Sequence, residues 1–192
     1  MGKGRLEAFS DGVLAVVITI MVLELKVPHG TELSALVPLV PVFLSYVLSF
    51  VMVGIYWNNH HHVWQAAHSV NGAVLLANMH LLFWLSLFPF VTGWMGENHF
   101  ASVPAALFGV VALMSAFAYT ILIRTLIALH GKDSSLAKAI GGDTKGWISL
   151  GLYAVAIPAA FYDGVVSFGI YVLVAMIWFI PDTRIERTIA KR

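Results

Sequence analysis

The chain has 192 residues, of which 59% are hydrophobic and 11% are charged, with a net charge of +1 and a mean hydropathy of +0.85. A soluble domain carries about 25% charged residues, so this composition excludes an ordinary water-soluble protein and indicates a chain embedded in lipid. Cysteine is absent, which excludes disulfides and thiolate chemistry.

Six apolar segments follow one another along the chain, at residues 8–25, 36–57, 71–95, 103–129, 147–162 and 165–180. A helix needs about 20 apolar residues to cross a bilayer, and the first four segments meet that length. The last two are shorter and only Asp163 and Gly164 separate them, so we expect a tight helical hairpin. The runs lack the alternation of a membrane β-barrel. The predicted fold is all-α: a six-helix transmembrane bundle that forms a single domain, 1–192.

Lysine and arginine are distributed unevenly between the predicted loops. If the N-terminus is cytoplasmic and six spans follow, only Lys26 lies outside. The inner basic residues are Lys3, Arg5, Arg124, Lys132, Lys138, Lys145, Arg184, Arg187, Lys191 and Arg192. Basic loops stay on the cytoplasmic side. We therefore expect a multi-pass protein of the plasma membrane with both termini in the cytoplasm.

The first apolar segment begins with a polar stretch, Arg5 to Asp11. The segment exceeds the apolar core of a signal peptide, about 7–15 residues, and no small-x-small cleavage site follows it, so we expect it to remain as a helix. Arg5, Ser10 and Asp11 then lie in the first turns of a membrane helix, where an ionised carboxylate is costly unless it is paired or hydrated. We favour a buried polar network that joins this helix to its neighbours; the alternative is a simple N-terminal cap.

Further along the same segment, Gly12, Val16, Thr19, Ile20 and Leu23 are spaced so that they share one face of a helix. This face carries one hydroxyl group, no charge and otherwise aliphatic groups. Ordinary packing against lipid or a protein core would explain it equally well, so the pattern alone does not identify a site.

The chain has eight histidines, and three of them are consecutive, His60 to His62. Consecutive helical residues point about 100° apart, and the i, i+4 pairs typical of helical zinc sites are absent, so we expect no metal and no cofactor. These histidines should instead hydrate the inner end of the second helix, where one of them could bond the cluster of Arg5, Ser10 and Asp11. His80 in the third segment is a candidate donor to Ser10 or Asp11; a hydrogen bond that only packs helices together is the alternative.

Several functional classes lack their signatures. There is no Walker A motif for ATP-driven transport, no T-V-G-Y-G potassium filter and no G-x-S-x-G nucleophile elbow. Charges within the apolar segments are nearly absent, which disfavours a carboxylate proton relay. We expect neither an enzyme nor a partner of nucleic acids.

The motif Arg5-x-x-x-Phe9-Ser10-Asp11 at the start of the first of six spans resembles the R-x-x-x-F-S-D signature of the endolysosomal-type transmembrane potassium channels, in their bacterial branch. The resemblance covers the whole chain and implies one six-helix repeat per chain and a homotetramer whose first helices line the pore. It implies that Val16, Thr19, Ile20 and Leu23 form the pore and gate, whereas Arg5, Phe9, Ser10 and Asp11, with His80, form a structural network. This chain departs from the family at Val16, where isoleucine or leucine is expected, so the narrowest ring stays open between Val16, Ile20 and Leu23.

These expectations lead to one functional hypothesis. The chain would conduct K⁺ in the bilayer without a carbonyl filter, and a ring of aliphatic side chains would close the path by excluding water. A proton channel or small-solute transporter on the same scaffold is the first alternative, since a histidine such as His80 could titrate. A membrane metalloenzyme that uses His60 to His62 is the second.

Overall fold

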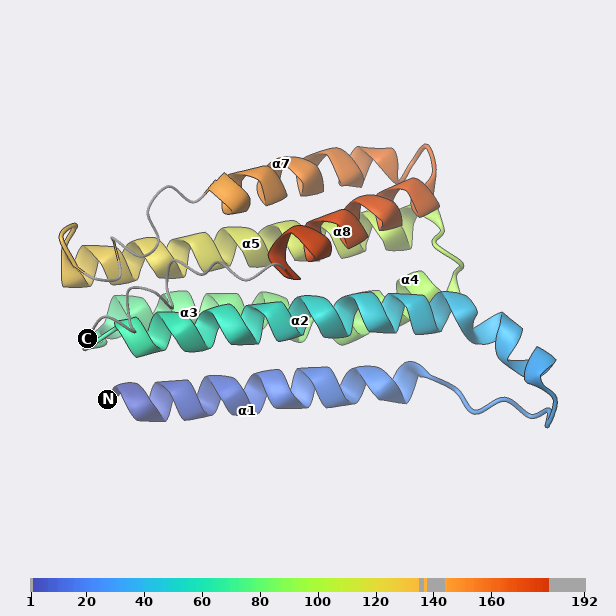
Figure 1. The fold of residues 1–192 in the computed structure, drawn as a ribbon, viewed down its shortest axis with the longest axis horizontal. Coiled ribbons are helices and arrows are strands. Elements are labelled where there is room, and N and C mark those ends of the chain that lie inside the picture. Colours follow the sequence, from blue (N-terminus) through green and yellow to red (C-terminus); the bar gives the residue numbers. More distant parts are fainter. Residues whose placement is uncertain (1, 135–136, 138–143, 180–192) are drawn as a thin grey trace.

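The computed structural model describes residues 2–134, 137 and 144–179, and within them every regular element is helical (Figure 1). The elements are α1 (Lys3–Met21), η1 (Val22–Glu24), η2 (Leu33–Leu39), α2 (Val40–Ala66), α3 (Gly72–Ser86), α4 (Phe88–Glu97), α5 (Ser102–His130), α7 (Thr144–Ala159) and α8 (Gly164–Phe179). The all-α fold predicted from composition is therefore confirmed.

Four helical stretches are long and apolar enough to cross a membrane: Lys3–Glu24, Leu33–Ala66, Gly72–Glu97 and Ser102–His130. The third combines α3 and α4, which meet at Leu87 because Pro89 follows at the start of α4 and cannot donate a backbone hydrogen bond. α7 and α8 have 16 residues each, or about 24 Å of helix. They form the expected hairpin; the predicted end of the last segment at residue 180 lies outside the described residues.

The turn between α7 and α8 explains the Asp163-Gly164 pair. The Asp163 carboxylate accepts a hydrogen bond from the backbone N–H of Val165 at 2.7 Å, and so caps the first turn of α8. A Cβ on Gly164 would lie 1.7 Å from the carbonyl oxygen of Phe100, which no side chain could tolerate. The glycine thus lets α8 pack directly against the loop that precedes α5.

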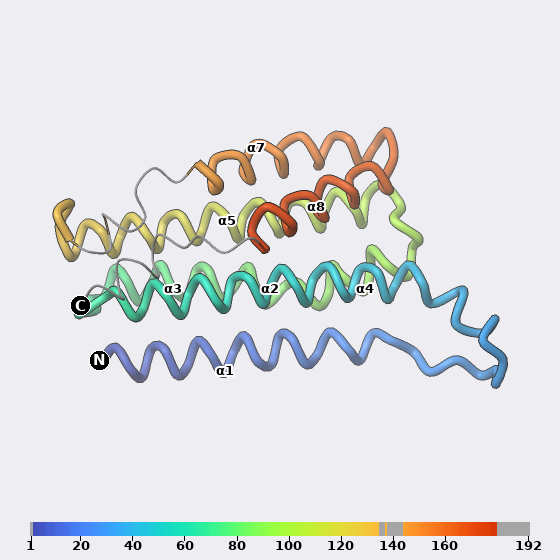
Figure 2. The backbone as a smooth tube through the Cα atoms, in the orientation of Figure 1, coloured from blue at the N-terminus to red at the C-terminus, as the bar shows by residue number. Residues whose placement is uncertain are grey.

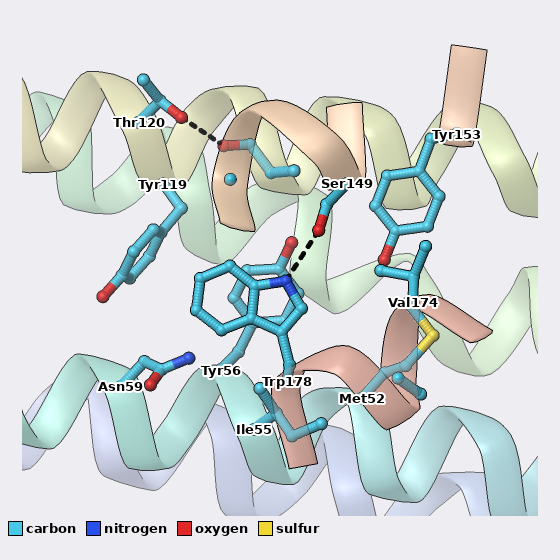
Figure 3. Close-up of a pocket in the computed structure, with 13 residues that line it drawn as sticks. Met52, Ile55, Tyr56, Asn59, Tyr119, Thr120, Ser149, Tyr153, Val174 and Trp178 are labelled. Carbon is cyan, nitrogen blue, oxygen red and sulfur yellow. Dashed lines mark hydrogen bonds between the residues drawn. The ribbon is translucent and has the colours of Figure 1, made fainter. Parts of the chain in front are cut away.

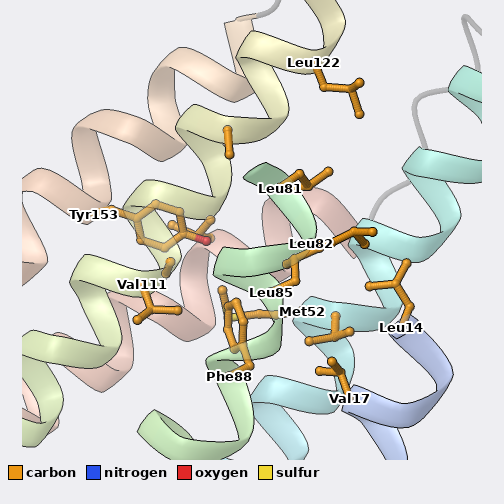
Figure 4. Packing of buried hydrophobic residues seen from close by; sticks show 14 of the residues in the cluster. Leu14, Val17, Met52, Leu81, Leu82, Leu85, Phe88, Val111, Leu122 and Tyr153 are labelled. Carbon is orange, nitrogen blue, oxygen red and sulfur yellow. The ribbon is translucent and has the colours of Figure 1, made fainter. Parts of the chain in front are cut away.

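α1 lies along one side of the bundle, where it packs against α2, α3 and α4 (Figures 1 and 2). α5 occupies the middle, between α3 and α4 on one side and the α7–α8 hairpin on the other. The core between α1 and the other helices includes Leu14 and Val17 of α1, together with Met52, Leu85 and Phe88 (Figure 4). α1 is therefore buried on one face only.

Two helix boundaries in the structure differ from those predicted from the sequence. The first helix begins at Lys3 rather than at residue 8, so Arg5, Ser10 and Asp11 lie within regular helix. The second helix continues past residue 57 to Ala66, so His60, His61 and His62 occupy consecutive positions in its last two turns rather than following its end. Both helices extend because polar residues at the ends of a membrane span keep helical hydrogen bonds while their side chains reach the interface.

Candidate functional site: the first helix and its polar anchor

The buried face of α1 consists of Leu6, Ser10, Leu14, Val17 and Met21. Their spacings of 4, 4, 3 and 4 keep them on one side of an α-helix. Ser10 is the one polar member of this face, and it is fully buried. A buried hydroxyl group in a membrane bundle needs hydrogen-bond partners, so its surroundings identify the contacts that orient α1.

Ser10 belongs to a chain of hydrogen bonds that crosses three helices. Its hydroxyl group donates to the carbonyl oxygen of Leu6 at 2.9 Å and accepts from the amide Nδ2 of Asn78, in α3, also at 2.9 Å. The Oδ1 atom of Asn78 lies 2.8 Å from Nε2 of His60 in α2. The indole N–H of Trp64 in turn faces the His60 ring. One buried line of polar groups thus joins α1, α3 and α2.

The directions of these bonds fit a single tautomer of His60. The Trp64 nitrogen lies 2.8 Å from Nε2 and 3.1 Å from Nδ1 of His60. If Nε2–H donates to Asn78 Oδ1, Nδ1 is free to accept the Trp64 N–H, whereas the other tautomer would leave Asn78 Oδ1 without a donor. Every donor then meets an acceptor from Trp64 to the carbonyl oxygen of Leu6. A protonated His60 would carry a second N–H where Trp64 needs an acceptor, so the network requires the neutral ring.

Asp11 and Glu7 make a second, more exposed set of contacts with α2. The Trp57 indole N–H donates to Oδ1 of Asp11 at 3.2 Å. The Trp57 ring stacks on the ring of His61, and Nδ1 of His61 lies 3.6 Å from Oε1 of Glu7. His61 also contacts the amide of Gln65 at 2.7 Å. The polar start of α1 therefore engages α2 directly through one tryptophan and one histidine, which is more than an N-terminal cap.

Arg5 and Phe9 are exposed in the single chain, and Phe9 shows 49% of its surface. The structure therefore brings Ser10 and Asp11 into contacts with α2 and α3 but leaves Arg5 and Phe9 on the outer side of α1. Within one chain, the predicted network contains only half of the motif.

The hydrogen bond predicted from His80 to Ser10 or Asp11 is wrong. His80 accepts the indole N–H of Trp84 at 3.0 Å, whereas Asn78 contacts Ser10. The two residues are two positions apart on α3, so they point about 200° apart, and only one of them can face α1. Asn78 and His80 are both polar residues in an apolar segment of the sequence. The rotation of α3 about its axis determines that Asn78 is the one that faces Ser10. Trp57 and Trp64 were missed as network members because terminal tryptophans are typical interfacial anchors.

The side of α1 opposite Ser10 carries Val16, Thr19 and Ile20, and Leu23 follows in η1. Val16 exposes 54% of its surface, Ile20 42% and Leu23 75%, and Thr19 is exposed as well. The Thr19 hydroxyl donates to the carbonyl oxygens of Ala15 at 2.9 Å and Val16 at 3.0 Å, which leaves its oxygen lone pairs facing outward. No described part of the chain covers this apolar sector.

An apolar groove runs beside this sector, between α1 and the junction of α3 and α4. Phe9, Gly12, Val16 and Ile20 form its α1 wall, and Phe90 is on the opposite wall. Val16 and Ile20 thus border both the groove and the uncovered face. A surface of this kind on a membrane helix suits another helix better than lipid, because small residues such as Gly12 permit close approach.

At the other end of α1 the chain carries both signs of charge. Lys26 forms an ion pair with Glu97 at the end of α4. Glu24 packs against the backbone of Gly93, also in α4. Lys26 forms its ion pair with Glu97, and the nearby charge of Glu24 adds a weaker attraction to Lys26, so this end of α1 carries one negative charge more than the pair balances.

A second hollow, of about 50 Å³, lies between α2, α5, α7 and α8 (Figure 3). Tyr56, Tyr119, Tyr153 and Trp178 surround it, and the Trp178 indole donates to the Ser149 hydroxyl at 2.7 Å. The hollow is large enough to hold water. No residue of α1 lines it, so it is separate from the uncovered face. Among the described residues no three histidine or carboxylate side chains gather as a metal site would require.

Comparison with known proteins agrees with this architecture. The family described as "Endosomal/lysosomal potassium channel TMEM175" matches residues 5–89. A protein of Chryseobacterium sp. (strain P1-3) named as a potassium channel is 54% identical over 189 residues, which cover 98% of each chain. A protein of Streptomyces collinus with the same kind of name is 35% identical over 125 residues, 61% of each chain.

The solved structure of a lysosomal potassium-selective channel TMEM175 homolog from Chamaesiphon minutus superposes with a TM-score of 0.80 at 29% identity. The superposition covers 94% of this chain and 97% of that one. The bundle is thus the fold of a family of membrane ion channels and not of enzymes. The chain belongs to the TMEM175 family, and the membership predicted from the first-helix motif is confirmed.

Proposed function

We propose that this chain is the subunit of a potassium channel in a bacterial plasma membrane, and that four copies surround a pore lined by α1. A relative that matches over 98% of each chain carries the name potassium channel, which supports the permeant ion. The observation that carries the assignment of the pore is the uncovered face of α1: Val16, Ile20 and Leu23 are exposed on a helix whose other face is anchored by Ser10.

The groove beside α1 supports the assembly. A copy of α1 from a neighbouring subunit would fill the groove between Phe9 and Phe90 and cover Val16 on one side. Thr19 points directly away from Ser10, so the fourfold axis of a tetramer would lie on the Thr19 side of the helix. Arg5 and Phe9, which are exposed in the described part of the chain, would then lie near the neighbouring subunit.

The conduction path on this helix would need no backbone carbonyls. α1 is a continuous helix from Lys3 to Met21, so its carbonyl oxygens are used in i→i+4 hydrogen bonds. Rings of Val16, Ile20 and Leu23 would exclude water when they are close together and pass ions after a small displacement of α1. A ring of Thr19 hydroxyls would offer oxygen lone pairs to a partly dehydrated K⁺.

Liposome flux tests this function. Purified protein should pass K⁺ out of K⁺-loaded vesicles and into K⁺-free ones, and Leu23→Ala should increase the flux because it widens a water-excluding ring. Val22→Ala is the matched control: Val22 adjoins Leu23 and is 45% exposed, but it points to the other flank of the helix. Absence of K⁺ flux, or equal effects of the two variants, would contradict the proposal.

A proton channel is the second candidate, because a chicken relative is named an endosomal/lysosomal proton channel. That match is 29% identical over 149 residues and covers 30% of the relative's length. Between Asp11 and Glu24, α1 carries no titratable side chain, which disfavours a relay of side-chain protons along this helix. A pH-sensitive dye inside the vesicles separates the two functions, since a proton channel would acidify or alkalinise them without added K⁺.

A further inference from the structure

The side of the bundle that faces away from α1 carries an exposed arginine inside a membrane-crossing helix. Arg124 is exposed on α5, beside α7, and α7 lies on the far side of the bundle from α1 (Figure 1). In an assembly around α1, this side faces the lipid. An uncompensated charge on a lipid-facing surface is costly, so Arg124 needs a partner.

In the part of the chain that the structure describes, the contact partner of Arg124 is an aromatic ring. The Arg124 guanidinium lies over the indole of Trp147, at 5.9 Å from the ring centroid. Among the described residues this is the contact that the structure gives its side chain, and Trp147 itself is 63% exposed. A cation–π contact uses the flat face of the guanidinium and leaves the N–H donors at its edge free.

The depth of this pair suits the headgroup region of a bilayer. Arg124 precedes the end of α5 at His130 by six residues, or about 9 Å along the helix axis. Trp147 lies in the first turn of α7, which starts at the same end of the bundle. Tryptophan and arginine near the end of a span are typical of the membrane–water interface.

Further into the bilayer than Arg124 and Trp147, α5 and α7 both expose apolar side chains. Phe117 lies two turns before Arg124 on the same face of α5 and is 48% exposed. On α7, Ile148 is 47% exposed and Val155 59%. The surface of Gly151 between them is open, with nothing near the position of a Cβ. A cationic group above a shallow apolar strip matches a phosphate above acyl chains.

We propose that Arg124 and Trp147 form a binding site for the phosphodiester headgroup of an anionic phospholipid, which bridges α5 and α7 at the inner leaflet. The edge N–H groups of the guanidinium donate to two phosphate oxygens, and the Trp147 ring holds the guanidinium plane. The inner leaflet is the anionic side that basic loops face. The site does not depend on ion conduction.

Native mass spectrometry of the purified full-length protein tests the site, with phosphatidylglycerol and phosphatidylcholine titrated separately. Phosphatidylglycerol should bind more tightly than phosphatidylcholine. Arg124→Gln should lower the affinity for the first bound phosphatidylglycerol by about fivefold or more, because a charge-assisted bidentate contact is lost. Arg124→Lys keeps the positive charge but lacks the bidentate geometry of a guanidinium, so its affinity for phosphatidylglycerol should lie between those of the unmodified protein and Arg124→Gln. Trp147→Leu weakens binding as well, because the guanidinium loses its support.

Lys132→Gln is the matched control, since it removes one exposed positive charge from the same end of the bundle without touching Trp147. Its affinity for phosphatidylglycerol should equal that of the unmodified protein. Equal losses in Arg124→Gln and Lys132→Gln would overturn the site in favour of diffuse charge attraction. Displacement of the lipid by millimolar inorganic phosphate would overturn it in favour of a simple anion site. Either failure leaves K⁺ flux, and thus the proposed function, unaffected.

Discussion

The amide Nδ2 of Asn78 donates a hydrogen bond to the hydroxyl oxygen of Ser10 across 2.9 Å, in the buried seam between α3 and α1. This contact fixes the rotation of α1 about its own axis, because Ser10 can face α3 in only one orientation of the helix. With Ser10 turned inward, Thr19 and Leu23 turn outward. The polar anchor and the uncovered apolar face are therefore two consequences of one helix orientation.

Replacement of Ser10 by alanine should destabilise the protein by about 1–3 kcal/mol, because the buried amide of Asn78 loses its acceptor. Ser115→Ala is the matched control: Ser115 is equally buried and makes the same bond to its own helix, to the carbonyl oxygen of Val111, but it is not part of the chain of hydrogen bonds through Asn78. Thermal unfolding in detergent, followed by tryptophan fluorescence, measures both. Equal losses in the two variants would show that the contact with Asn78 contributes nothing.

Much of the fold could be predicted from the sequence, because long apolar runs cross membranes whatever their partners are. The polar start of α1 and its aliphatic face could also be located, because the spacing of residues along a single helix predicts both. The choice between Asn78 and His80 could not be predicted. Both are polar residues of the same apolar segment, and the decision depends on how α3 is rotated against α1, which is a property of tertiary packing.

The hydropathy of the sequence also could not predict where the helices end. His60 lies in the last turns of α2 and is buried, although a histidine-rich stretch after an apolar run predicts a hydrated helix end. Its burial depends on Asn78 and Trp64, which together satisfy both ring nitrogens. A buried polar group of this kind becomes visible only when its partners, far apart in sequence, are brought together.

Asp11→Ala should lower the fraction of assembled tetramer and the yield of protein more than it changes the preference for K⁺ over Na⁺. Asp11 accepts a hydrogen bond from Trp57 and lies on the α2 side of α1, away from Thr19 and Leu23. Native mass spectrometry gives the oligomeric fraction, and reversal potentials give the ion preference. Trp57→Phe should reproduce the effect in weaker form, and Trp84→Phe, which breaks only the bond to His80, should not. A large change in ion preference with an intact tetramer would refute the structural role of Asp11.

The ion pair between Lys26 and Glu97 should stabilise the protein up to about pH 10 and stop doing so at higher pH. The hydrogen bond and the charge of Glu97 raise the pKa of Lys26 above its ordinary value of 10.5. A raised lysine pKa adds stability that is complete below the unfolded value and disappears as the pH rises through the folded value. Because the side chains are exposed, the contribution is small and screened by salt.

The measurement is the difference in melting temperature between the unmodified protein and Lys26→Met, recorded from pH 7 to above pH 11. The difference should vanish at the upper end, and in about 1 M salt at pH 7, where the Debye length is about 3 Å. A difference that persists under both conditions would mean that Lys26 acts through packing of its aliphatic stem.

Glu24→Gln should reduce single-channel conductance at low K⁺ concentration and leave it unchanged at high concentration. Glu24 lies beside the outer end of the uncovered face, and Lys26 is paired with Glu97. A ring of carboxylates there would concentrate cations by an attraction that salt screens. Glu32→Gln, at an exposed position before η2, is the control. Identical conductances for Glu24→Gln and the unmodified channel at low K⁺ would remove Glu24 from the ion path.

We propose that the face of α1 opposite Ser10 lines the ion path. Because the chain has no cysteine, single introduced thiols can test this directly. Thr19→Cys and Leu23→Cys place single thiols on this face, and Val22→Cys places one on the neighbouring flank. A cationic methanethiosulfonate reagent should block K⁺ flux through the first two channels and leave Val22→Cys and the unmodified protein unaffected. Full flux through modified Thr19→Cys and Leu23→Cys channels, with mass spectrometry confirming that the thiols reacted, would contradict the account.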